Sequence, residues 1–124
     1  MDTAYGHIAT NEALIAETLE EMTTEEAVRT YFSDIPVMIH IARCESTFRH
    51  TLEDGSVLQG RVDPADTGVM QINKRYHETT ADTLGLDLDN LYDNMAYARN
   101  LYERQGVQPW SASAPCWGKT IAMR

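Results

Sequence analysis

The chain has 124 residues, and its ten basic and nineteen acidic residues give a formal net charge of −9. This length suffices for one domain with its own hydrophobic core, without support from metal ions or several disulfides. The negative charge repels phosphate backbones and anionic membranes, so it argues against a nucleic-acid partner. We therefore expect a single domain, 1–124, that acts as a monomer on a partner that is neutral or is recognised through other forces.

The longest apolar run, 35–42, is far too short to span a bilayer, so we expect no membrane insertion. No basic residue precedes Arg29, and the chain therefore lacks the n-region of a signal peptide. If the protein works outside the cytoplasm, its export signal has been removed or lies upstream.

The first part of the chain, 1–34, is acidic and has helical periodicity. Its apolar residues predict an amphipathic helix that begins near Thr10 or Asn11. Thr23 and Glu26 then form a capping-box pattern, which predicts the start of a second helix. We interpret these helices as a scaffold extension of the domain.

A third helix is predicted to begin at Pro36, because proline is tolerated in the first helical turn. Either Ser33 or Asp34 is expected to cap it. An apolar pattern continues to Ala42, so the helix leads directly into Glu45.

The carboxylate of Glu45 is the leading catalytic candidate. Met38, Ile41 and Ala42 precede it by seven, four and three residues, so all four lie on one helix face. Apolar neighbours disfavour the charged form of a carboxyl group, so its pKa rises and it can hold a proton near neutral pH. The structural alternative is a helix-end glutamate that reaches solvent or pairs with Arg43 or Arg49.

A small antiparallel sheet is expected after this helix. Residues 51–58 have Asp54 and Gly55 at their centre, which predicts a hairpin. An Asp-rich loop follows at 60–66, and the apolar run 69–72 predicts a third strand or an extended segment.

Two further helices are predicted, and Asn73 is expected to cap the first of them. That helix carries Tyr76, Thr80 and Leu84 on a common face and stops at Gly85.

The second of these helices is expected to be capped by Asp89 and to run up to Gly106. Its apolar residues at helical spacing are Leu91, Met95, Ala98 and Tyr102. The segment 108–117 contains two prolines and two tryptophans and has no period, so it predicts an irregular cover over the core.

Cys44 and Cys116 lie seventy-two positions apart and match no zinc-binding spacing. One disulfide and two buried free thiols are both consistent with this count. His40 and Cys44 are four residues apart on one predicted helix, but no second pair completes a metal site. We therefore expect neither a metal ion nor a cofactor.

Several motifs now fall into a known order. The stretches 42–48 (Ala-Arg-Cys-Glu-Ser-Thr-Phe) and 68–77 (Gly-Val-Met-Gln-Ile-Asn-Lys-Arg-Tyr-His), followed by Gly106 and Trp110, resemble soluble lytic transglycosylases and goose-type lysozymes. The resemblance covers 35–117, about two thirds of the chain, which would be the catalytic core. It implies an α+β fold, mostly α, of lysozyme-like type, with a small antiparallel hairpin or sheet flanking the catalytic helix.

The resemblance also implies a reaction, cleavage of the β-1,4 bond between N-acetylmuramic acid and N-acetylglucosamine in the glycan strands of peptidoglycan. Glu45 matches the family's catalytic acid, Gln71 matches a substrate-contacting glutamine, and Asn73 matches a neighbouring position that lines the cleft. The chemistry agrees, because glycoside cleavage must protonate a poor leaving oxygen.

The placement of the cysteines is similar to that in the resuscitation-promoting factors. One cysteine directly precedes the acid at Glu45, and the other follows a C-terminal Trp. This similarity favours a disulfide between Cys44 and Cys116, and with it an extracytoplasmic location in the periplasm, cell wall or medium.

The chain departs from the family in two places. The usual Ala-Tyr-Asn segment after Gly106 is absent, and Ser113 or Tyr97 is a candidate to replace its hydroxyl. Goose-type lysozymes place aspartates that position water, and Asp63 and Asp66 lie in a corresponding place. Each of these four side chains is also explained by packing or turn formation alone.

The step after bond breakage separates two enzyme classes. A hydrolase needs a second carboxylate to activate water or to act as nucleophile. Without a second carboxylate, Glu45 can act first as the acid and then as the base. It then takes a proton from the muramic acid 6-hydroxyl, which attacks the anomeric carbon of the same sugar at high effective concentration. We expect a lytic transglycosylase, with a goose-type hydrolase or a non-catalytic glycan-binding, envelope or phage module as alternatives.

Overall fold

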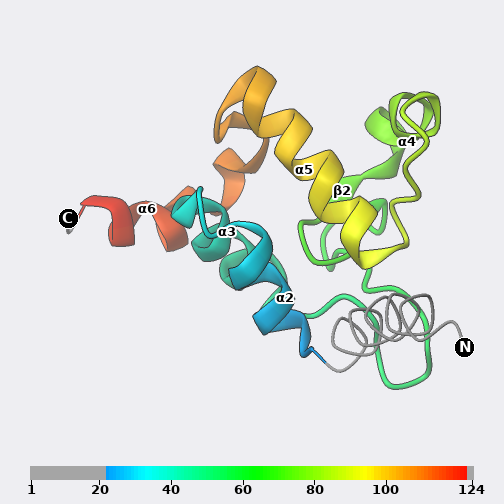
Figure 1. The fold of residues 1–124 in the computed structure, drawn as a ribbon, viewed down its shortest axis with the longest axis horizontal. Coiled ribbons are helices and arrows are strands. Elements are labelled where there is room, and N and C mark those ends of the chain that lie inside the picture. The colour runs from blue at the N-terminus through cyan, green and yellow to red at the C-terminus, as the bar shows by residue number, and fades with distance from the viewer. Residues whose placement is uncertain (1–21, 123–124) are drawn as a thin grey trace, which may run out of the picture.

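The structure is a computed structural model that describes residues 22–122, and for 120–122 it describes the backbone alone. The fold is α+β and mostly helical, with one small antiparallel sheet, as predicted (Figure 1). The helix expected near Thr10 or Asn11 lies outside the described residues. In the part of the chain that is described, no helix combines the length and apolar character needed to cross a bilayer.

The first described helix, α2 (Thr24–Tyr31), begins as its capping box predicts. The Thr23 hydroxyl accepts a hydrogen bond from the Glu26 backbone N–H at 3.1 Å, and the Glu26 carboxylate accepts one from the Thr23 N–H at 3.0 Å. Ala27 and Val28 face the core and are buried.

The helix that carries the catalytic candidate, α3 (Pro36–Ser46), has the predicted extent, but its predicted cap is wrong. Ile35 occupies the cap position and makes no side-chain cap hydrogen bond, so neither Ser33 nor Asp34 caps the helix. Asp34 instead pairs with Arg99, 65 positions away, at 2.9 Å. A long-range ion pair has replaced the local cap.

The sheet consists of β1 (Asp66–Thr67) and β2 (Ile72–Asn73), and its register pairs Asp66 with Asn73 and Thr67 with Ile72. The expected extended run at 69–72 is therefore mostly a turn. Gly68 and Gln71 adopt left-handed backbone conformations, with φ of 73° and 52°, which a strand does not contain.

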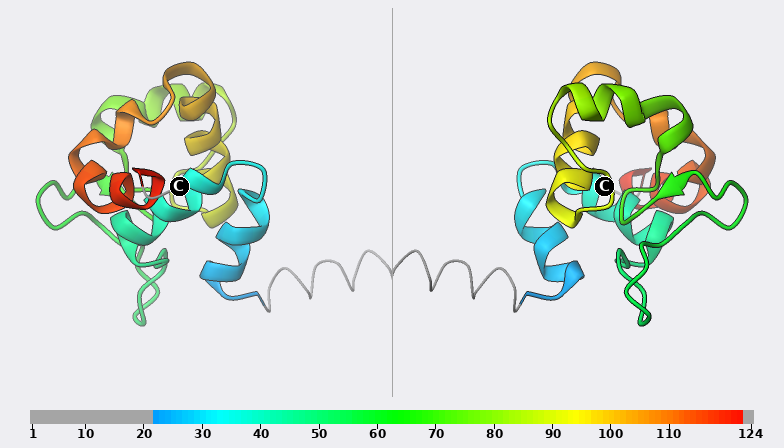
Figure 2. Two further views of the ribbon diagram at one scale, coloured as in Figure 1. Left: turned by 90° about the vertical axis from the view of Figure 1, so that its left-hand side faces the viewer. Right: turned by 90° about the vertical axis from the view of Figure 1, so that its right-hand side faces the viewer.

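The hairpin expected at 51–58 forms as a turn with a single β-bridge, between Thr51 and Val57, and has no regular strands. The Asp54 carboxylate accepts a hydrogen bond from a backbone N–H two residues later at 3.0 Å, and Gly55 has a φ of 87°. The Asp-Gly turn therefore forms where it was predicted. In Figure 2 the segment 51–58 extends away from the helices.

Asn73 caps the next helix, α4 (Lys74–Thr83), as predicted. The face with Tyr76, Thr80 and Leu84 is not packed against the core, because Tyr76 is 71% exposed and Leu84 is 48% exposed. The buried residue of α4 is Ala81, and a shift of one residue changes the direction of a side chain around the helix by about 100°.

The longest helix, α5 (Leu91–Gln105), ends at Gly106 as predicted, but its cap is Asn90 rather than Asp89. The carboxylate of Asp89 instead pairs with Lys74 at 2.8 Å. The buried residues of α5 form the centre of the core: Asn94, Met95, Tyr97, Ala98 and Leu101. In Figure 1, α3 and α6 lie on one side of α5 and α4 lies on the other.

The C-terminal segment covers the core, as predicted, but it is helical although its sequence has no period. A 3₁₀ helix, η1 (Gln108–Ser113), continues into α6 (Ala114–Ala122). Pro109 and Pro115 both fall in first helical turns, where the missing N–H costs nothing, so they did not break the helices. Trp110 and Trp117 are buried, and the segment does cover the core.

The disulfide between Cys44 and Cys116 is present, as predicted, and it joins α3 to α6. These two helices pack side by side (Figure 1). The C-terminal cover is therefore attached directly beside Glu45.

The turn at 68–71 is held by two buried polar side chains. The Asn94 side-chain oxygen accepts a hydrogen bond from the Met70 N–H at 3.0 Å, and its amide donates to two backbone carbonyls at 2.9 and 3.0 Å. His50 Nδ1 accepts a hydrogen bond from the Val69 N–H at 3.0 Å. The turn that carries Gln71 is thus fixed from both sides.

We predict that Gly68→Ala lowers the free energy of unfolding by about 3 kcal/mol, since a strained backbone and overpacking add together. Its φ is 73°, and an added Cβ would lie 2.5 Å from His50 Cε1 and 2.7 Å from Asn94 Nδ2. Gly85→Ala is the matched control, because its φ is 75° and no atom lies within 4 Å of an added Cβ. Its expected loss in urea denaturation is about 1 kcal/mol. Equal losses would refute the steric argument.

Candidate active site

A cleft of about 500 Å³ lies at the C-terminal end of α3. Its lining residues are Cys44, Glu45, Arg49, Leu58, Gln59, Arg61 and Gln71. A second hollow, of about 270 Å³, also has Gln71 in its lining, together with Asp66, Asn73, His77 and Trp110. The two hollows therefore meet at Gln71.

A larger hollow, of about 700 Å³, lies against the segment 56–60. Its charged lining residues, Lys74 and Asp89, pair with each other at 2.8 Å. Asp89, the carboxylate in this lining, is therefore held in an ion pair. We therefore place the candidate active site in the cleft of about 500 Å³ that Glu45 lines.

The Glu45 side chain has the environment that the sequence predicted. Met38, Ile41 and Ala42 on the same helix face are fully buried, and Glu45 is half-buried at the edge of the cleft. Burial raises the pKa of Glu45, the hydrogen bond from Ser113 opposes this shift, and the charge of Asp66 adds to it.

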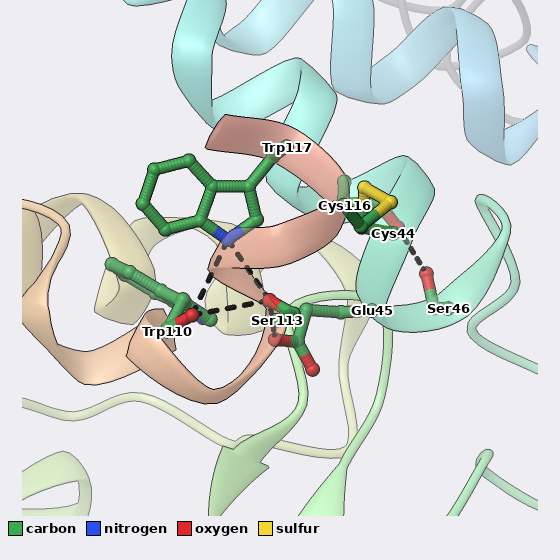
Figure 3. Close-up of a disulfide and its surroundings, with 8 residues drawn as sticks. Cys44, Glu45, Ser46, Trp110, Ser113, Cys116 and Trp117 are labelled. Carbon is green, nitrogen blue, oxygen red and sulfur yellow. Dashed lines mark hydrogen bonds between the residues drawn. A yellow bond between two sulfur atoms is a disulfide. The ribbon is translucent and has the colours of Figure 1, made fainter. Parts of the chain in front are cut away.

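The hydroxyl of Ser113 lies directly on the Glu45 carboxylate. Its Oγ donates to Glu45 Oε2 at 2.5 Å and accepts a hydrogen bond from Trp117 Nε1 at 2.9 Å (Figure 3). The carbonyl oxygen of Trp110 lies 3.1 Å from the same hydroxyl. Of the two candidates for the missing hydroxyl, Ser113 is the one that reaches the acid.

This arrangement suits both protonation states of Glu45. When the carboxylate is ionised, Ser113 donates its proton to it. When the carboxyl is protonated, it can donate to Ser113 Oγ, whose own proton then turns to the Trp110 carbonyl. The hydrogen-bond network can therefore follow the movement of a proton without losing a partner.

The disulfide holds these two residues together. Cys44 directly precedes Glu45, and Cys116 follows Ser113 by three residues. Figure 3 shows the bridge between α3 and α6 next to the hydrogen bond between the two side chains. The acid and its hydroxyl partner, 68 positions apart, are thus linked covalently through their neighbours.

Gln71 is in the lining of both the Glu45 cleft and the 270 Å³ hollow. Its Nε2 donates to the Gly68 carbonyl at 3.0 Å, which fixes the orientation of the amide. Its φ of 52° is unfavourable for a residue with a side chain, at a cost of about 1 kcal/mol. Such strain is concentrated at functional sites.

The two predicted aspartates have different surroundings. Asp63 accepts hydrogen bonds from both terminal nitrogens of Arg75, at 3.0 and 3.2 Å, and Arg75 together with the Ala65 N–H and Asn73 lowers the pKa of Asp63 to about 2. Asp63 lines neither the Glu45 cleft nor the 270 Å³ hollow, whereas Asp66 lines the latter. Of the two, only Asp66 therefore lines a hollow that shares Gln71 with the Glu45 cleft.

Asn73 organises this region as well as lining the smaller hollow. Its Nδ2 donates to Asp63 at 2.9 Å and to Asp66 at 3.0 Å, and its Oδ1 caps α4 through the Arg75 N–H at 3.0 Å. With its amide engaged at both ends, Asn73 positions Asp66.

Tyr97 lines neither the Glu45 cleft nor the 270 Å³ hollow. It is fully buried, and its hydroxyl is hydrogen-bonded to His77 Nδ1 at 2.9 Å. Burial lowers the pKa of His77, which lines the smaller hollow. The core position of Tyr97 on α5 explains why its hydroxyl does not reach the cleft.

From the sequence, Arg49 was expected only as a possible ion-pair partner of Glu45, a pair that does not form, and Arg61 was not singled out. Arg49 follows Glu45 by four residues, a spacing that marks one helix face only inside a helix, and α3 ends at Ser46. Arg61 belongs to the loop before β1, and no sequence pattern linked it to the acid.

Metal binding has no donor set in the described part of the chain, where no three His, Cys, Asp or Glu side chains cluster suitably. Cys44, which was considered with His40, is used in the disulfide.

The comparisons with protein-family models, curated proteins and solved structures returned no match to this chain.

Proposed function

We propose that the protein is a lysozyme-like muramidase that cleaves the β-1,4 bond between N-acetylmuramic acid and N-acetylglucosamine in peptidoglycan. The observation that carries the proposal is the environment of Glu45, which is half-buried on an apolar helix face with a raised pKa and opens onto a cleft. This environment is what a general acid for glycoside cleavage needs.

In the first step, protonated Glu45 gives its proton to the glycosidic oxygen while the bond to the anomeric carbon of the muramic acid breaks. Positive charge develops on the sugar ring, and the carboxylate that forms beside it stabilises this charge. Ser113 then donates to the new carboxylate across the 2.5 Å contact. Gln71, with both a donor and an acceptor on its amide, suits the N-acetyl or hydroxyl groups of a sugar.

In the second step, we propose that the muramic acid 6-hydroxyl attacks the anomeric carbon and gives its proton to the Glu45 carboxylate. The product is a 1,6-anhydro sugar, no water is consumed, and Glu45 is protonated again for the next cycle. Two observations favour this route: Arg75 holds Asp63, and Asn73 holds Asp66. An internal hydroxyl also needs less positioning than a water molecule.

Hydrolysis is the second candidate, and Asp66 is the observation that favours it. This residue lines the smaller hollow, and its charge acts on Glu45. A carboxylate in that place would activate water for an inverting reaction.

We also propose that the protein works as a monomer outside the cytoplasm. The Cys44–Cys116 disulfide supports this location, since such bridges persist in oxidising compartments. The described helices are compatible with it, because none is suited to crossing a membrane.

We predict that purified peptidoglycan treated with the protein loses turbidity and releases muropeptides ending in 1,6-anhydromuramic acid, identified by mass spectrometry. Asp66→Asn, which keeps an oxygen to accept from Asn73, is expected to retain activity within a few-fold, because the internal reaction needs no second carboxylate. Reducing muramic acid ends, lost in Asp66→Asn, would instead establish hydrolysis. Binding without any loss of turbidity would indicate a non-catalytic glycan-binding module.

A further inference from the structure

Two arginines line the cleft that contains Glu45. Arg49 comes from the chain just after α3, and Arg61 comes from the loop before β1, so they reach the cleft from separate segments. The chain as a whole has a net charge of −9. A cleft with two guanidinium groups therefore differs in charge from the rest of the molecule.

These arginines are not used in ion pairs. Among residues 22–119, Arg29, Lys74, Arg75 and Arg99 each pair with a carboxylate, whereas Arg49 and Arg61 do not. Arg49 Nε donates to the Ser46 carbonyl at 3.0 Å, which anchors one edge of its guanidinium and leaves the terminal nitrogens available. Guanidinium groups with an available edge bind carboxylates through two parallel hydrogen bonds.

We infer that Arg49 and Arg61 form a binding site for a carboxylate carried by the glycan strand. The inference rests on the proposed function, because peptidoglycan presents carboxylates beside the scissile bond and an unsubstituted N-acetylglucosamine chain presents none. Two groups share this chemistry: the lactyl group of a muramic acid that carries no peptide, and the carboxylates of a stem peptide, whose attachment turns the lactyl carboxylate into an amide. The site would select substituted strands and fix which sugar lies next to Glu45.

The test measures the affinity of the Glu45→Gln protein for three soluble tetrasaccharides. These are chitotetraose, a peptide-free muramic acid oligomer with free lactyl carboxylates, and the same oligomer with stem peptides. We expect the last to bind at least about tenfold more tightly than chitotetraose, and Arg49→Gln or Arg61→Gln to remove most of that difference. The preference should weaken at high salt, since the groups lie at an open cleft.

Arg43→Gln is the matched control, because Arg43 is exposed on the same helix as Glu45 but does not line the cleft. If the peptide-free muramic oligomer binds more tightly than the substituted one, in which an amide bond to the peptide has replaced the lactyl carboxylate, that carboxylate is the ligand. If it binds as weakly as chitotetraose, the stem peptide is the ligand, and if both muramic oligomers bind equally tightly, the site accepts either carboxylate. In proteins that retain Glu45, the KM values for the three oligosaccharides are expected to follow the same order as these affinities.

Two results would overturn the inference and can be told apart. Equal affinity for all three oligosaccharides, unchanged in the Arg49 and Arg61 variants, removes the carboxylate site while cleavage of peptidoglycan by the parent protein still stands. If no oligosaccharide binds and the parent cleaves nothing, the proposed function fails and the site fails with it.

Discussion

Replacing Glu45 by glutamine is expected to lower the rate of peptidoglycan cleavage by at least about a hundredfold while the fold is kept. Glutamine has nearly the same volume, and its side-chain oxygen can still accept the hydrogen bond from Ser113. It has no proton to give to a leaving oxygen. Turbidity loss and product release would both be measured. Activity within a few-fold of the parent would rule out Glu45 as the general acid.

The same variant has a defined effect on stability. Because burial raises the pKa of Glu45 in the folded state, this group favours folding at low pH and loses that contribution as the pH rises through its folded pKa. At neutral pH, Glu45→Gln should therefore be at least as stable as the parent, which separates lost chemistry from lost folding. Glu53→Gln, at an exposed position, is the control and should change neither property.

The pH profile of the parent follows from the same shift. A general acid works only while it is protonated, so the activity should fall as the pH rises through the raised pKa of Glu45.

Removing the disulfide with a Cys44→Ala and Cys116→Ala double variant is expected to lower the free energy of unfolding by about 4 kcal/mol, because the bridge closes a long loop. The sequence separation of its cysteines is 72 residues. Unfolding in urea without reductant measures the loss. A difference below about 1 kcal/mol would contradict this account.

Activity should fall as well, even far below the unfolding temperature, because α6 positions Ser113 against Glu45. The parent protein treated with reductant should resemble the double variant, and the variant itself should not respond to reductant. If the variant is fully active in the folded state, the bridge stabilises the fold without positioning Ser113.

Local signals in the sequence predicted the parts of the fold that local hydrogen bonds decide. The capping box at Thr23, the cap at Asn73 and the stop at Gly106 all formed as predicted, because each depends on neighbours within a few residues. The wrong caps failed for the opposite reason. Asp34 and Asp89 pair with distant cations, Arg99 and Lys74, and such partners leave no local pattern.

The same distinction applies to the site. Glu45 was predicted because its apolar neighbours share one helix face, and Gln71 was predicted from a short motif. The contact of Ser113 with Glu45 joins residues 68 positions apart. It depends on η1 and α6, two helices that were not predicted because the segment contains two prolines and has no period. Periodicity within one helix contains no information about such a contact. The resemblance left Ser113 and Tyr97 as alternatives, and the placement of α6 against α3 decides for Ser113.

The left-handed backbone at Gln71 bears on how this protein can be engineered. A chain selected for thermal stability alone would carry glycine at this position, because glycine adopts a φ of 52° without strain. Glutamine there indicates selection for what its amide reaches, at the junction of the two hollows. A programme that relaxes strained positions to raise the melting temperature would include residue 71 beside Thr47 and Phe48, whose φ values are also positive. If the proposed function holds, the change at residue 71 would gain stability at the expense of activity.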